Sequence, residues 1–179
     1  MEAPDFNHIR NLLQRQKRKE LKKIEPKLIQ YFDYEVLSYS LRRPCIHIWI
    51  CGIFLYWIEL WQTAKQANGS DPLPNYILGL LQQLMVKHHV ITVTDYTQLQ
   101  RDDVVLYCWK DGENIHTDRV VINTVINGLK VNIQFLKDFM VGKSFTRTFN
   151  SDSFKLATRI VYDIPKRKQS SYLFFFFNS

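Results

Sequence analysis

The chain has 179 residues, of which 46% are hydrophobic and 23% charged, and this composition excludes a wholly disordered protein. Its formal net charge of +7 favours acidic partners such as nucleic acid, an anionic cell-wall polymer or a membrane surface. Three cysteines are an odd and small number, which argues against a disulfide scaffold and favours a reducing compartment. They form no CxxC pair, which argues against a zinc finger.

The first 44 residues are expected to form a basic helical extension. An amphipathic helix is predicted over residues 8–24, and a second over 26–41, starting at a proline that suits the first helical turn. The first helix carries six basic side chains: Arg15, Lys17, Arg18, Lys19, Lys22 and Lys23. Such a run is typical of a solvated helix face, and alternatively of a surface that docks on phosphates, including those of nucleic acid. Because the N-terminus lacks the apolar segment of a signal peptide, we expect synthesis in the cytoplasm, with either retention there or export by a route other than a standard signal.

Residues 45–61 are apolar nearly all round, which predicts burial. The segment is shorter than the roughly 20 apolar residues of a membrane span, and His47 and Glu59 interrupt it. A buried core helix is therefore predicted, and no transmembrane span. The alternating isoleucines over 46–50 also allow a short extended segment before a helix that starts near Cys51.

The rest of the chain predicts a second helix followed by an antiparallel sheet. The helix covers residues 75–87, and the strands are centred on 90–93, 104–107, 120–125, 129–135 and 158–162. An Asn-Gly turn at 127–128 joins two of these strands as a hairpin. The predicted class is α+β, with N-terminal helices packed on an antiparallel sheet. The organisation is a helical extension over 1–44, a main domain over 45–165 and a basic, aromatic tail over 166–179.

Two strand motifs follow a cysteine-bearing helix. The segment 99–107 (LQRDDVVLY) resembles the pattern L-x-x-G-D-V-V-x-F, and 116–121 (HTDRVV) resembles H-V-G-I-V-V. Both patterns are typical of the NlpC and CHAP superfamily of papain-like cysteine peptidases and amidases, and the resemblance covers roughly residues 45–163. The order of a cysteine on a helix and a histidine on a later strand is also what thiol hydrolysis requires. The resemblance implies a papain-like fold.

The resemblance also implies residue roles. Cys51 would be the nucleophile, His116 the general base and acid, and Asn132 or Gln134 the group that orients the imidazole. The reaction would be amide hydrolysis of a peptide or peptidoglycan-like substrate through a thioester acyl-enzyme, with no metal or cofactor. Cys45, which follows two arginines and a proline, is the alternative nucleophile.

Two other functions remain open. The chain could be a non-enzymatic nucleic-acid-binding protein that uses its basic N-terminal helix. Its aromatic residues lie in apolar runs and are not interleaved with lysine and arginine, which disfavours a base-stacking surface. The chain could also be an inactive member of the same fold that acts as an interaction module, because a cysteine in an apolar segment is more often structural than catalytic.

Overall fold

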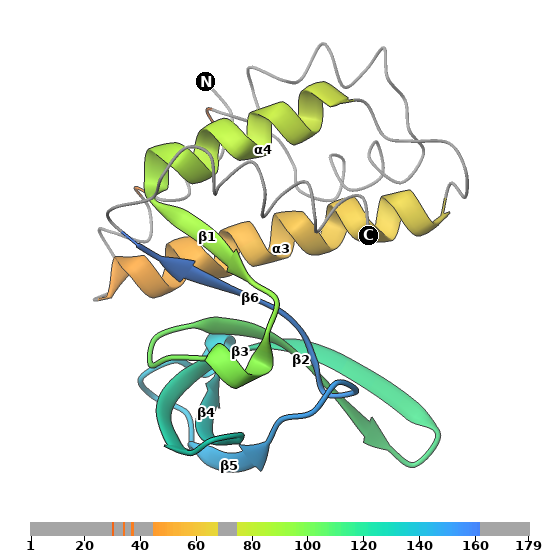
Figure 1. The fold of residues 1–179 in the computed structure, drawn as a ribbon, viewed down its shortest axis with the longest axis vertical. Coiled ribbons are helices and arrows are strands. Elements are labelled where there is room, and N and C mark those ends of the chain that lie inside the picture. Colours follow the sequence, from red (N-terminus) through yellow and green to blue (C-terminus); the bar gives the residue numbers. More distant parts are fainter. Residues whose placement is uncertain (1–29, 31–33, 35–36, 38–44, 68–74, 162–179) are drawn as a thin grey trace.

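The computed structural model describes residues 30, 34, 37, 45–67 and 75–161. The predicted helix over 8–24 with its six basic side chains and the tail over 166–179 lie outside these residues. Of the predicted helix over 26–41, the structure describes residues 30, 34 and 37, and all three are helical. The described part is α+β, with two helices and one antiparallel sheet, as predicted. In Figure 1, α3 and α4 lie in the upper part with β1 and β6 beside them, and β2 to β5 curl round below.

Within residues 45–67 and 75–161, two helices precede six strands, and two short 3-10 helices lie in the connections. The elements are α3 (Ile46–Ala67), α4 (Asn75–His88), β1 (Val90–Val93), η1 (Tyr96–Gln98), β2 (Val104–Asp111), β3 (Asn114–Asn127), β4 (Lys130–Phe135), η2 (Leu136–Asp138), β5 (Phe145–Thr148) and β6 (Phe154–Ile160). The strand order is β1-β6-β2-β3-β4-β5, and every neighbouring pair is antiparallel. The last described strand therefore lies between the first two.

Most predicted elements are confirmed, and two differences matter. The short strand β5 was not predicted, because four residues give too little alternation to recognise. The extended segment before a helix starting near Cys51 is wrong, since α3 begins at Ile46. Residues 48–51 are all buried, so the alternating isoleucines reflect burial on several sides of a helix and not a strand.

Alternation along the strands produces two packed layers. On β2, Val105 and Tyr107 belong to a cluster on one face, while Val104 and Leu106 lie on the other. The cluster contains Val93, Leu99, Val105, Tyr107, Val120, Ile122, Val131, Ile133, Phe149, Phe154 and Ala157. The curl of β2 to β5 seen in Figure 1 allows residues from so many strands to meet in one core.

α3 packs on the other face of the sheet, against β2, β3 and β6. Two strand side chains donate hydrogen bonds to carbonyl oxygens inside the helix. Thr158 Oγ1 donates to Cys51 O at 2.8 Å, and Arg119 Nη1 donates to Gly52 O at 2.7 Å. Any Cβ at Gly52 would overlap the Leu136 side chain of η2. The glycine therefore leaves room for the Leu136 side chain against α3.

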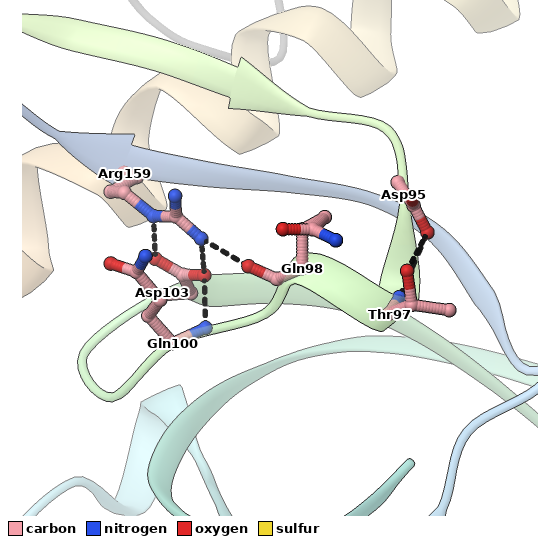
Figure 2. Close-up of polar contacts among 6 residues, drawn as sticks. All are labelled: Asp95, Thr97, Gln98, Gln100, Asp103 and Arg159. Atoms are coloured by element: carbon pink, nitrogen blue, oxygen red, sulfur yellow. Dashed lines mark hydrogen bonds and ion pairs between the residues drawn. The ribbon is translucent and has the colours of Figure 1, made fainter. Parts of the chain in front are cut away.

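The carboxylate of Asp103 at the start of β2 connects distant parts of the chain (Figure 2). It has no exposed surface, and it accepts hydrogen bonds from Arg159 Nε and Nη2, both at 2.7 Å. It also accepts one from the backbone N–H of Gln100 at 2.8 Å, while Arg159 Nη2 donates to Gln98 O. Burial raises the pKa of the Asp103 carboxyl, and the hydrogen bonds from Arg159 and Gln100 oppose this rise. The ion pair joins β2, β6 and the η1 turn.

We expect Asp103→Ala to lower the free energy of unfolding by about 3 kcal/mol, because it removes the carboxylate that pairs with the largely buried Arg159 guanidinium. Urea denaturation followed by circular dichroism measures this change. The double variant Asp103→Ala/Arg159→Met should recover part of the loss, since it removes the buried guanidinium as well. The exposed Asp152→Asn is the control and should change the midpoint little. Equal midpoints for Asp103→Ala and wild type would contradict the expectation.

Candidate functional site

Cys51, the predicted nucleophile, lies inside α3 on the side that packs against the sheet. Its side chain is 1% exposed. Burial raises the pKa of the Cys51 thiol far above its ordinary value, and the negative charge of Asp103 raises it further. Because α3 begins five residues earlier, the thiol also lacks the helix N-terminus expected for it. Cys51 is held as a protonated core residue in this structure.

His116, the predicted general base, lies in β3 directly opposite Trp109 of β2. Its ring stacks on the Trp109 ring with centroids 5.4 Å apart, and its Nε2 atom is 3.9 Å from Asp111 Oδ2. Trp109 packs against the core cluster on the sheet face opposite α3, so strand alternation places His116 on that face as well. The structure therefore does not bring His116 and Cys51 together.

Asn132 and Gln134 were predicted to orient the His116 imidazole. Asn132 Oδ1 instead accepts a hydrogen bond from Asn123 Nδ2 at 3.2 Å, across β3 and β4. The buried Gln134 donates to two backbone carbonyl oxygens, those of Asp138 and Gly142. Both side chains lie on the strand face opposite Val131 and Ile133, as alternation predicts, but their partners fix the local backbone and not the histidine.

Cys45, the alternative nucleophile, is exposed at the start of α3. Its backbone has a positive φ of 58°, and its carbonyl accepts the N–H of Ile48 at 3.0 Å. Two residues further on, His47 Nε2 lies 3.4 Å from Asp102 Oδ2, and both side chains are partly exposed. The His47–Asp102 pair therefore lies at the end of α3 that the exposed Cys45 precedes in sequence. The sequence indicated Cys45, but nothing in it placed Asp102 beside His47.

The motif L-x-x-G-D-V-V has a conformational explanation in this chain. Asp102 occupies the glycine position of the motif and adopts a positive φ of 72°. Leu99 is buried in the core cluster, and Asp103 forms the buried ion pair. The motif residues therefore build a turn and a strand start, and none of these three roles requires catalysis.

A row of aromatic rings crosses three strands on the sheet face opposite α3. We call Tyr107, Trp109, Phe135 and Phe145 the aromatic row. Successive ring centroids are 5.3, 5.7 and 5.2 Å apart. Tyr107 is buried, while the other three rings are half-buried and border the core cluster. The row runs from the core to the solvent.

Two cations cover the outer rings of the aromatic row. Lys137 Nζ lies 5.4 Å from the centroid of the Phe135 ring, and the guanidinium carbon of Arg147 lies 4.7 Å from that of Phe145. The pairing of β4 with β5 brings these groups together. Aromatic and basic residues are therefore interleaved by the fold and not by the sequence, which is why the sequence indicated no stacking surface.

The positive charge is unevenly distributed along the chain. Residues 45–161 contain 11 Lys and Arg against 10 Asp and Glu, a net charge of +1. Residues 1–44 carry 10 basic and 6 acidic side chains, and residues 162–179 carry 3 and 1. The segments that flank the sheet domain in sequence therefore supply six of the seven net charges.

Comparison with known proteins adds no identification. A scan against protein-family models, a search of curated proteins and a search of solved structures each found no match. Within residues 45–67 and 75–161, neither helix is long and apolar enough to cross a membrane. Among the same residues, no three His, Cys, Asp or Glu side chains are grouped so that they could hold a metal ion. The candidate sites rest on geometry and chemistry.

The exposure of the three thiols gives a direct test. We expect iodoacetamide to add one group to the folded protein, at Cys45, because Cys51 and Cys108 are buried. Denaturant should raise the number of adducts to three. Intact-protein and peptide mass spectrometry count and place them. Rapid modification of Cys51 in the folded protein would contradict its buried, protonated state.

Proposed function

We propose that the chain is a non-catalytic binding protein that holds single-stranded nucleic acid on its aromatic row. The observation that carries this proposal is the row itself, with a cation over each of its two outer rings. Proteins that bind single strands without strict sequence preference combine stacking rings with cations that contact the backbone phosphates. Both parts occur here on one face of the sheet.

The chemistry of the row suits stacked bases. Trp109, Phe135 and Phe145 are half-buried, so their packing in the sheet holds their rings in place. The His116 ring stacks on Trp109 and the Arg147 guanidinium lies over Phe145, so an incoming base would displace one of these groups. A base stacked on an aromatic side chain gains about 1–3 kcal/mol. The exposed Arg147, moved off the Phe145 ring, would contact the phosphate next to that base.

The charge distribution supports a division of roles. The sheet domain is nearly neutral, so it would supply stacking and little long-range attraction. The flanking segments are basic, and they would supply phosphate neutralisation and the salt dependence that follows from counterion release. The protonated, buried Cys51 and its separation from His116 also favour a binding role over catalysis by that pair.

We expect Arg147→Gln to weaken binding of a fluorescein-labelled oligothymidine by about tenfold, and Trp109→Leu to weaken it at least as much. Fluorescence anisotropy at low and at moderate salt measures both, and wild-type affinity should fall as salt rises. The matched control is Arg101→Gln, which removes the same charge from an exposed arginine outside the row.

Equal losses for Arg147→Gln and Arg101→Gln would show that only net charge matters, and would overturn the role of the row. An absence of binding by wild type at low salt would overturn the proposal altogether. Circular dichroism of Trp109→Leu checks that the sheet is intact, since this ring borders the core.

One observation favours a second candidate function, thiol-dependent amide hydrolysis at Cys45. The exposed thiol lies two residues before His47, whose imidazole is within 3.4 Å of the Asp102 carboxylate. In this proposal the Cys45 thiolate attacks the amide carbon, and protonated His47 gives its proton to the leaving amine. Water then cleaves the thioester. Asp102 would hold the imidazole in position, as the third group of such triads does.

The rate of alkylation of Cys45 tests this second function. If His47 pairs with the thiolate, the wild type should react with iodoacetamide several-fold faster than His47→Gln below pH 7, and the two rates should converge at high pH. Asp102→Asn should fall between them. Identical pH profiles for wild type and His47→Gln would exclude activation of Cys45 by this histidine.

A further inference from the structure

The loop between η2 and β5 presents an apolar tip. Met140 and Val141 are adjacent, and 59% and 84% of their surfaces are exposed. Val141 has the largest exposed fraction among the large hydrophobic residues that the structure describes as exposed. Single exposed apolar residues are common on protein surfaces, whereas two adjacent ones at the end of a loop indicate a contact surface.

Hydrogen bonds at the base of the loop hold the tip in place. The buried Gln134 side chain donates hydrogen bonds to the carbonyl oxygens of Asp138 and Gly142, at 3.2 and 2.6 Å. The backbone N–H groups of Val141 and Gly142 both donate to the same Asp138 oxygen. Four hydrogen bonds therefore close the base of the loop and fix the direction in which the tip projects.

The backbone at the tip adopts a conformation that is unfavourable for its residue type. Met140 has a φ of 74°, a left-handed conformation that is sterically costly for a residue with a long side chain. Glycine or asparagine would make the same turn at lower cost. A methionine held there, with most of its side chain in water, is better explained by contact with an apolar environment than by the turn alone.

The charges beside the tip indicate the kind of environment. The exposed Lys137 and Lys143 flank the tip in sequence. Asp138 lies between them, and Lys137 Nζ is 3.7 Å from Asp118 Oδ2, so these two lysines and two aspartates sum to zero net charge. The chain as a whole is at +7. An exposed apolar pair flanked by lysines matches a lipid interface, where the ammonium groups lie at the level of the headgroups and the net charge of the whole chain supplies the long-range attraction.

We propose that the Met140–Val141 tip inserts into the interface of an anionic lipid bilayer as a peripheral contact. The net charge of +7, most of it on the flanking segments, attracts the surface, and the tip supplies the apolar part of the contact. The tip and the aromatic row use different apolar side chains but share Lys137, which lies over Phe135, so the two proposals are tested with different variants.

A fluorescent label tests insertion directly. Val141→Cys in a Cys45→Ser background carries one accessible thiol, because Cys51 and Cys108 are buried, and the full chain is labelled there with NBD. Vesicles of phosphatidylcholine and phosphatidylserine should shift the emission to the blue and increase it. The matched control is a label at Ile126→Cys, an exposed apolar position at the end of β3, which should not respond.

Co-sedimentation gives the second measurement. Met140→Ser/Val141→Ser should weaken the apparent affinity for these vesicles by about tenfold, while Ile126→Ser should leave it unchanged. The proposal would be overturned if the wild type did not sediment with the vesicles. It would also be overturned if the wild type sedimented but the label on the Val141→Cys variant did not respond to them. A shift of that label as protein concentration rises without lipid would overturn it in favour of self-association. An equal response to phosphatidylcholine alone would overturn the anionic selectivity.

Discussion

The buried carboxylate of Asp103 is the constraint on which the rest of the sheet depends. Its ion pair with Arg159 fixes β6 beside β2, and its bond to the Gln100 N–H fixes the turn that enters β2. With β6 in place, Thr158 reaches the carbonyl of Cys51 and holds α3 across the sheet. A charged pair in a core adds little stability over a well-packed apolar pair, but losing one partner is costly. The Asp103–Arg159 pair therefore determines where the elements that it joins lie, as well as stabilising them.

The sequence predicted the elements whose formation depends on residues close along the chain. It missed the side-chain contacts that depend on which strands and helices lie together. Alternating residues and the Asn-Gly turn were enough to locate β2, β3 and β4. The four-residue strand β5 was missed, and with it Arg147, whose position over Phe145 depends on a strand too short to recognise. Likewise, nothing within α3 indicates that Asp102 lies beside His47.

Cys45 and Cys51 show why motif order alone is a weak guide to catalysis. Both precede the strands and His116 in the sequence, so both satisfy the order of cysteine, then strand, then histidine. Cys51 lies inside α3 and is buried, whereas Cys45 precedes the first residue of α3 and is exposed. The packing of α3 on the sheet, which the motif order does not reveal, therefore separates a core thiol from an accessible one.

The position of β6 has a consequence for the order of folding. Val93 in β1 pairs with Ala157 in β6, 64 residues later, and β6 also separates β1 from β2. During synthesis β1 and one edge of β2 must therefore stay unpaired until almost the whole sheet domain has left the ribosome. Non-local pairing of this kind is slow and exposes strand edges to other chains. The nascent chain would depend on chaperones at the stage when only β6 is missing.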